Sequence, residues 1–505
     1  MFDRHPRTRT ALMLAILLVT LGTIAPSSGV GADQLFPVVD GVDQAFHPGR
    51  FDGGLLFSTD VPFCTGVDDP PECYDGEPLS VQAVSVGRRA LEPTVGIDKQ
   101  GNAFFAASWH DDSKAVVLPV THIRASFDGG LTWVDRTNRA PAQGEPLPPT
   151  NADPYVYVDQ TTNRLYNPEA AGACLYLNFS DDRGTTWLTN PIACGAGNVD
   201  HQSFGTGPFP PNLEAAETIY PNVLYYCSNQ VVFSMCHRSL DGGIVWTGSG
   251  SPAFQGYDSA AGGLCGGLAG HLDTDSDGRL FLPKGHCSAP WLATSADGGI
   301  TWTRTRVSSA LGTAGTHIAV ATDDADNVYV LWWDPTYRLP WLAVSTDHGA
   351  TFGAPMMVAP PGVQEVNFPE IEAGEAGKVA ITFPGGTQPS SAGTRRPWNQ
   401  YMVVTTNALD PDPLFVSTTA NPLSNPVHRG NCGPGRCGPM WDFIEITTSP
   451  LDGGFWAAIS DTCESTGCKG TGGMDSVSSG MGFAIRQLGG PAIRTGTQPL
   501  PLGGG

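Results

Sequence analysis

One short motif recurs five times between residues 126 and 352, and it limits the possible folds more than any other feature of the chain. Each copy follows the pattern S-x-D-x-G-x-T-W with small departures, and we call it the turn motif. The copies begin at Ser126, Ser180, Ser239, Ser295 and Ser345. A repeat with a period of about 50–60 residues predicts propeller blades, which stack around a common centre.

The residue types of the turn motif predict a turn that satisfies its own hydrogen bonds. Serine and aspartate side chains can bond backbone N–H groups a few residues away, and glycine allows a positive φ. We expect the aromatic residue to tuck under the turn and to begin the next strand. Recurring aspartates such as Asp128 and Asp297 are therefore assigned a structural role, not a catalytic one.

The turn motif resembles the Asp-box, the repeat of bacterial neuraminidases, and the resemblance covers about residues 90–490. It implies an all-β propeller of the sialidase-like superfamily, with four-stranded antiparallel blades. It also implies that the motif turns lie on the lower rim, whereas the active face is the upper one, where each innermost strand begins. Such a resemblance predicts the architecture and does not predict the ligand.

A second repeat of strand, turn and strand precedes the motifs, as at residues 93–105 and 154–166. The first strands of seven blades are expected near Pro93, Pro154, His201, His271, His317, Pro369 and Trp441. Six blades, as in true sialidases, are the alternative if the C-terminal third is divided too finely. Residues 79–86 alternate between apolar and polar, so we expect them to form the outer strand of the last blade and to close the ring.

The ends of the chain differ in composition from this repeat region. Residues 1–32 have a basic start, an apolar stretch at 11–24 and a small-residue cleavage site, which is typical of a secretory signal too short to span a membrane. Residues 33–78 are expected to be an extended lead-in, residues 79–488 the propeller, and the Gly/Pro/Thr-rich residues 489–505 a disordered tail. The mature protein is expected to be secreted and monomeric.

Cysteine usage favours the same compartment. The twelve cysteines fall into close neighbours, namely Cys64/Cys73, Cys174/Cys194, Cys227/Cys236, Cys265/Cys287, Cys432/Cys437 and Cys463/Cys468. We expect these pairs to form disulfides in an oxidising environment. Zinc binding is the alternative, but no C-x-x-C occurs and the spacing lacks a two-plus-two rhythm.

The formal net charge of −22 argues against two classes of partner. Nucleic acids and anionic membrane surfaces both require basic surface on the protein. No later run of 18 apolar residues predicts a membrane span. The resemblance to the neuraminidase repeat implies carbohydrate or a glycoconjugate as the expected partner.

Polar residues open the predicted inner strands, so a ring of seven blades would bring them to one upper central mouth. The candidate catalytic carboxylates are Asp153, Glu370 and Asp442, and the candidate substrate-binding residues are Glu92, His201, His271, His317 and Trp441. Glycoside hydrolysis requires two carboxyl groups about 5–9 Å apart, which this ring could supply. The alternative is that strand starts near solvent are polar and the channel simply holds water. Tryptophans such as Trp332, Trp341 and Trp398 could stack on sugar rings or pack between blades.

Two functions follow from these residues. The first is exo-glycosidase-type hydrolysis at the mouth, without a required cofactor; the alternative is a non-catalytic ligand- or protein-binding propeller. Sialidase chemistry itself is disfavoured, because the resemblance implies an Arg-Ile-Pro motif in the first blade. The chain has Arg88-Arg89-Ala90-Leu91-Glu92-Pro93 there and no Arg-Ile-Pro anywhere.

A calcium site is a further candidate. Asp273, Asp275 and Asp277 form a D-x-D-x-D-G sequence, with oxygen ligands on alternate residues and glycine at the sharp turn. The alternative is an ordinary hairpin turn, since the corresponding turns at residues 98–102 and 159–163 are also rich in Asp and Asn.

Overall fold

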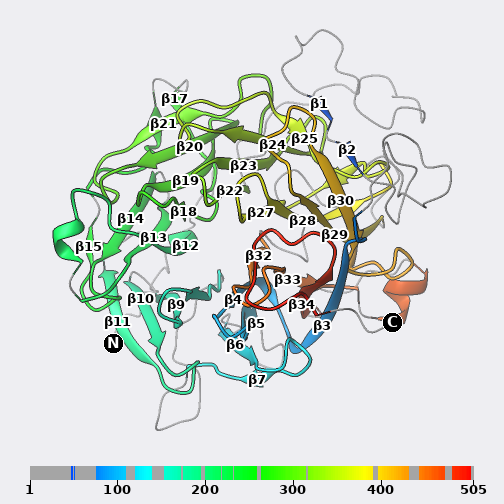
Figure 1. The fold of residues 1–505 in the computed structure, drawn as a ribbon, viewed down its shortest axis with the longest axis horizontal. Helices are drawn as coiled ribbons and strands as arrows, with labels where there is room; N and C mark the ends of the chain where they lie inside the picture. Colours follow the sequence, from blue (N-terminus) through cyan, green and yellow to red (C-terminus); the bar gives the residue numbers. More distant parts are fainter. Residues whose placement is uncertain are drawn as a thin grey trace, which may run out of the picture. The chain divides into compact units, whose positions relative to one another are not determined.

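The structure is a computed structural model that describes residues 47–48, 50–51, 76–109, 120–138, 153–171, 174–194, 199–217, 219–230, 233–248, 250–258, 263–313, 317–389, 396–430, 443–463, 465–471 and 480–501. Its strands form seven antiparallel, four-stranded blades around a centre, so the predicted propeller with seven blades is confirmed (Figure 1). No described helix is long and apolar enough to cross a membrane. The helical pieces of the described chain are η1 (Glu214–Ala216) and η4 (Gly467–Thr471).

Each blade runs outward from its inner strand. Blade 1 consists of β4 (Leu91–Ile97), β5 (Ala103–Trp109), β6 (Val120–Ser126) and β7 (Val134–Asp135). Blade 2 consists of β8 (Tyr157–Asp159), β9 (Arg164–Ala171), β10 (Cys174–Ser180) and β11 (Leu188–Cys194). Blade 3 consists of β12 (Val199–Gly207), β13 (Val223–Gln230), β14 (Phe233–Ser239) and β15 (Thr247–Gly248). Blade 4 consists of β18 (Asp273–Thr274), β19 (Leu280–His286), β20 (Ala289–Ser295) and β21 (Thr303–Arg306).

The last three blades carry additions. Blade 5 consists of β22 (Ile318–Thr322), β23 (Val328–Trp333), β24 (Pro340–Ser345) and β25 (Met356–Met357), with β1 (His47–Pro48) parallel to β25. Blade 6 consists of β27 (Glu370–Ala373), β28 (Val379–Gly386), β29 (Pro397–Thr405) and β30 (Leu414–Thr419), joined by β2 (Arg50–Phe51), β26 (Glu365–Val366) and β31 (His428–Arg429). Blade 7 consists of β32 (Glu445–Thr448), β33 (Phe455–Asp461), β34 (Met481–Gly489) and β3 (Ser80–Arg89). A separate hairpin pairs β16 (Tyr257–Asp258) with β17 (Gly263–Leu264).

The ring closes through strands from opposite ends of the described chain. β3 pairs antiparallel with β34, and Val84 lies opposite Ala484 in this register. The predicted closure of the last blade by residues 79–86 is therefore confirmed. Closure covers the edge that blade 7 would otherwise expose.

The turn motif has one hydrogen-bond pattern in all five copies. In the first copy, the Ser126 hydroxyl donates to Asp128 Oδ1 at 2.8 Å and accepts from Gly130 N at 2.8 Å. Asp128 Oδ1 also accepts from Thr132 N at 2.9 Å. Gly130 has a φ of 91°, and a Cβ there would lie 2.9 Å from Trp456 of blade 7. Glycine is therefore required both for the positive φ and for the close contact with the neighbouring blade.

Arginines from one blade reach the turn motif of the next blade. Arg164 of blade 2 donates to the Gly242 carbonyl at 3.0 Å, and Arg238 of blade 3 donates to the Gly298 carbonyl at 2.7 Å. Arg486 of blade 7 donates to Gly129 O of blade 1 at 3.3 Å. Through these inter-blade arginines, the motif turns also connect neighbouring blades.

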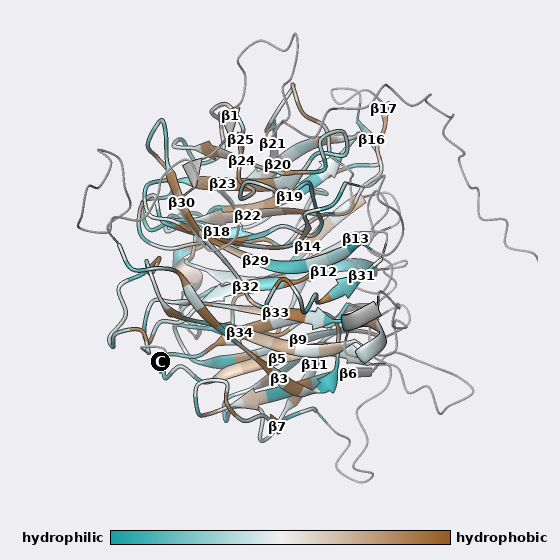
Figure 2. Ribbon diagram, turned by 90° about the vertical axis from the view of Figure 1, so that its right-hand side faces the viewer, coloured by the Kyte–Doolittle hydropathy of each residue, from teal (hydrophilic) through white to brown (hydrophobic). Residues whose placement is uncertain are grey.

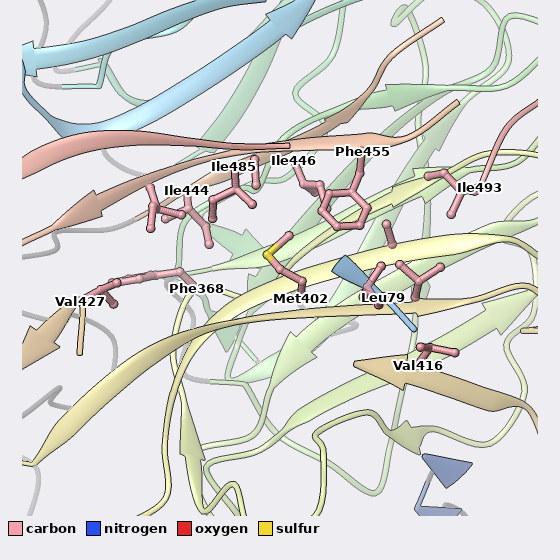
Figure 3. Close-up of a cluster of buried hydrophobic side chains, with 14 of the residues drawn as sticks. Leu79, Phe368, Met402, Val416, Val427, Ile444, Ile446, Phe455, Ile485 and Ile493 are labelled. Carbon is pink, nitrogen blue, oxygen red and sulfur yellow. The ribbon is translucent and has the colours of Figure 1, made fainter. Parts of the chain in front are cut away.

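Apolar side chains fill the spaces between neighbouring blades. Figure 3 shows the cluster that joins blades 6 and 7, in which Phe368, Met402 and Val416 lie near Ile446 and Phe455. Figure 2 shows that β22 and β23 of blade 5 are mainly hydrophobic, whereas β12 of blade 3 carries more hydrophilic residues. Trp332, Trp341 and Trp398 are fully buried in this packing, so their role is in the core and sugar stacking by them is excluded.

The tail is ordered as far as Pro501, so the prediction of disorder from residue 489 is wrong for residues 490–501. Ile493 is fully buried, and its carbonyl accepts a hydrogen bond from Glu375 N at 2.8 Å. Arg494 Nη1 contacts Asp324 Oδ1 at 2.5 Å. Composition alone does not predict this order, because the segment is poor in apolar residues. It is held by the buried side chain of Ile493 and by backbone hydrogen bonds to blade turns.

Four of the predicted disulfides are present, namely Cys174–Cys194, Cys227–Cys236, Cys265–Cys287 and Cys463–Cys468. The first two link neighbouring strands within blades 2 and 3. The other two predicted pairs, Cys64/Cys73 and Cys432/Cys437, lie outside the described residues.

Candidate functional site

Ionisable side chains gather where the inner strands begin, on the face opposite the motif turns. We call them the mouth cluster: Glu92, Asp153, Tyr155, His201, His271, His317, Glu370 and Glu445. They come from β4, β12, β27 and β32 and from the residues just before β8, β18 and β22. Most are buried, although Glu445 and His271 keep 14% and 10% of their side-chain surface exposed.

Local backbone distortion turns two of these side chains into position. Glu92 has a φ of 50° and His201 a φ of 47°, and each lies at a break in the register of its inner strand. A non-glycine residue in this region costs about 1–2 kcal/mol, and bulges of this kind redirect a side chain. The distortion at His201 is held by a hydrogen bond from its N–H to Asp153 Oδ2 at 2.8 Å. Strain maintained at a cluster of ionisable groups is typical of functional sites.

His271 lies at the centre of the cluster. Its Nδ1 is 2.9 Å from Glu445 Oε2 and 3.6 Å from Glu370 Oε1. Glu370 Oε1 is also 2.6 Å from His317 Nε2. The ring of His271 meets Tyr155 edge-on, with the ring centres 5.0 Å apart. Two carboxyl groups from blades 6 and 7 therefore converge on one imidazole from the segment that opens blade 4.

The cluster combines strong burial with close opposite charges. Burial alone would lower the pKa of His271, but the carboxylates of Glu445, Glu370 and Asp153 raise it to about 9. Burial raises the pKa of Glu445, and the neighbouring His271 opposes that shift. Burial likewise raises the pKa of Asp153, although His201 acts in the other direction. The mouth therefore combines an imidazole that favours its cationic form with carboxyl groups that hold protons more strongly than usual.

The structure brings six of the sequence-predicted site residues to this cluster, namely Glu92, Asp153, His201, His271, His317 and Glu370. Asp442 and Trp441 lie outside the described residues, so their roles stay predictions. Sequence reasoning missed Tyr155 and Glu445. Tyr155 lies two residues after Asp153, the spacing that returns to one side of an extended chain, and Glu445 opens β32 as Glu370 opens β27.

The predicted calcium loop has other partners in the structure. Asp273 Oδ2 accepts from Thr322 N at 2.6 Å, so this carboxylate bonds to the neighbouring inner strand. Asp275 Oδ1 accepts from Asp277 N at 3.1 Å, as in a hairpin turn. Arg279 Nη1 lies 2.6 Å from Asp277 and 3.2 Å from Asp275. Calcium binding here stays a prediction, and it would compete with the Arg279 guanidinium.

Two groups of described residues have ligand atoms close enough to share a metal ion. Within each group these atoms lie within 4.8 Å of one another: His271, Glu370 and Glu445 in the mouth, and Asp277, Asp326 and His348 near the motif turns. The second group already has hydrogen-bond partners, since Ser276 donates twice to Asp326 and Arg279 contacts His348. The mouth group is the better candidate metal centre.

No family model and no curated protein matches the chain. Solved structures with similar folds include a Hadza microbial sialidase, with a TM-score of 0.41 and 16% identity over 59% of this chain and 64% of that one. A GH74 enzyme from Niastella koreensis has a TM-score of 0.42 and 14% identity over 74% of this chain and 51% of that one. A mutant of NanB sialidase from Streptococcus pneumoniae has a TM-score of 0.42 and 11% identity, covering 84% and 72%. At these values the matches identify neither a reaction nor a ligand for this chain.

Proposed function

We propose that the protein is a secreted, monomeric glycoside hydrolase that acts at the central mouth. The observation that carries this proposal is the convergence of carboxyl groups from separate blades, in which Glu370 and Glu445 both contact His271 while Asp153 adds to the negative field that raises the pKa of the same imidazole. Hydrolysis of a glycosidic bond needs one carboxyl group to protonate the leaving oxygen and a second to assist water or the anomeric carbon.

Asp153 is the candidate general acid. Its carboxyl group is buried, burial raises its pKa, and its Oδ2 is fixed by the N–H of His201. A carboxyl group that keeps its proton near neutral pH can donate it to a leaving group. Glu370, on blade 6, is the candidate partner carboxylate, and the exposed edges of His271 and Glu445 are where a sugar would enter.

Four disulfides in the described chain support an extracellular setting, because such bonds persist in oxidising compartments. The acidic net charge of −22 supports a neutral or hydroxyl-rich ligand over a polyanion.

The test is release of fluorophore from a panel of aryl glycosides, sialosides included, by the purified mature chain. We expect turnover of at least one glycoside, and a loss of at least about a hundredfold in Asp153→Asn and in Glu370→Gln. Glu214→Gln is the matched control, since Glu214 is an exposed residue of η1 and does not belong to the mouth cluster. A folded, disulfide-bonded protein that cleaves no member of the panel would refute hydrolysis.

One observation favours a second candidate, a non-catalytic binding propeller. Glu370 and His317 are only 2% and 1% exposed, so the deepest groups of the cluster are poorly accessible to a sugar. A binding role would show as retention on a glycan array without turnover, and that retention would be weakened by Glu445→Gln.

A further inference from the structure

Three buried polar atoms meet in the mouth without the geometry that hydrogen bonds require. His271 Nδ1, Glu370 Oε1 and His317 Nε2 are all buried, and none has a hydrogen-bonded partner. Yet Nδ1 is 2.9 Å from Glu445 and 3.6 Å from Glu370, and Nε2 is 2.6 Å from Glu370. Buried polar atoms left without a hydrogen bond cost about 1–3 kcal/mol each, so such crowding needs an explanation.

A cation between these atoms provides one. Around a tetrahedral ion with bonds of about 2.0–2.2 Å, neighbouring ligand atoms are roughly 3.4 Å apart. The observed separations of 2.9 and 3.6 Å around His271 lie on either side of that value. A proton on His271 Nδ1 can be donated fully to only one of the two carboxylates, whereas an ion can be bound by His271, Glu370 and Glu445 together.

We propose that the mouth holds a divalent transition-metal ion of the Zn²⁺ class, bound by His271 Nδ1, Glu370 and Glu445. Mixed imidazole and carboxylate ligands suit such ions, and three protein ligands leave one coordination position open. The open position faces the partly exposed edges of His271 and Glu445, where water or a ligand hydroxyl can reach the ion. His317, whose side chain is fully buried, is a positioning residue that fixes Glu370.

The three ligands come from separate parts of the ring, which gives the ion a structural consequence. His271 precedes β18 of blade 4, Glu370 opens β27 of blade 6, and Glu445 opens β32 of blade 7. An ion bound there links blade 4 across the centre to blades 6 and 7, neither of which is its neighbour in the ring. Metal binding should therefore stabilise the folded ring by mass action. The inference shares the mouth with the proposed hydrolysis, but it is measured without substrate.

The experiment titrates Zn²⁺ into the untagged mature protein after dialysis against a chelator, with a competing Zn²⁺ indicator as the readout. We expect one equivalent to bind and the melting temperature to rise. His271→Asn and Glu445→Gln should each weaken binding at least about a hundredfold. His348→Asn is the matched control, because it removes a ligand from the other candidate group near the motif turns.

Each outcome decides the inference. Circular dichroism checks that the variants fold. If His271→Asn does not fold, Glu445→Gln still tests the site, because Glu445 is partly exposed. Absence of stoichiometric binding by the wild-type chain overturns the proposal, as does binding that survives both mouth variants or is lost only in His348→Asn. Co²⁺ in place of Zn²⁺ gives an absorption spectrum that changes with the nitrogen and oxygen ligands. Ion binding without glycoside turnover, or turnover without an ion, separates this inference from the proposed function.

Discussion

Asp297, in the fourth turn motif, allows the role of the motif to be measured. Its Oδ1 accepts from Ile300 N at 3.0 Å and Thr301 N at 2.9 Å, and its Oδ2 accepts from the Thr301 hydroxyl at 2.6 Å. Burial acts to raise the pKa of Asp297, but the bonds from Thr301 and Ser295 outweigh it and lower the pKa. The ionised carboxylate is therefore the form that holds the turn.

Asp297→Ala removes these bonds at once. A net hydrogen bond contributes about 1 kcal/mol, and the exposed N–H groups can turn to water, so we expect a loss of about 2–3 kcal/mol in the free energy of unfolding. The neighbouring Gly298 carbonyl accepts from Arg238 of blade 3, so a loosened turn also weakens the contact between two blades. The loss should appear in urea titrations as a lower midpoint with an unchanged slope.

The third copy of the motif supplies an internal comparison, because Val245 stands where the other four copies have threonine. Thr301→Val should cost less than Asp297→Ala, and it should cost almost nothing when Asp297 is already alanine. Glu214→Ala, on an exposed short helix, is the control for composition alone. If Asp297→Ala destabilises no more than that control, within about 0.5 kcal/mol, the structural role assigned to the motif is refuted.

Three further predictions concern stability. Burial lowers the pKa of His428 to about 4, against about 6.5 in the unfolded chain. As pH falls from about 6.5 to about 4, only the unfolded chain gains this proton, so about 3 kcal/mol of stability is lost. The urea midpoints at the two ends of this range should differ less in His428→Gln than in the wild type, and an equal difference would contradict the assignment. Ile493→Ala should cost about 2–4 kcal/mol because the side chain is fully buried, and protease should then cleave the tail, whereas a resistant tail would show that Ile493 does not anchor it. Replacing Cys227 and Cys236 together by serine should cost about 2–3 kcal/mol by thermal unfolding, and no change in melting temperature would count against a stabilising cross-link.

The architecture was predictable because local chemistry repeats. Five motif turns have the same bonds, and the alternation of residues 79–86 was enough to predict that β3 closes blade 7. The tail was not predictable from composition, since its order depends on Ile493 meeting a core formed by distant blades.

The site was predictable only in part. The sequence placed the inner strand of blade 7 near Trp441, whereas β32 begins at Glu445. A shift of this size selects a different carboxylate, so Asp442 was named and Glu445 was missed. The left-handed backbone at Glu92 and His201 leaves no glycine signal in the sequence, because tertiary contacts maintain it.

The pairing of β3 with β34 also determines when the molecule can be complete. Strand β34 (Met481–Gly489) is synthesised long after its partner β3 (Ser80–Arg89), so blade 7 cannot assemble until β34 has been made. Until then the growing protein has two unpaired sheet edges, which are sites for misassembly with another chain. Contacts between strands so far apart in sequence form slowly, because the intervening chain must be ordered before the contact can stabilise the fold. The growing chain therefore depends on its open blade edges being kept unpaired until β34 has been made.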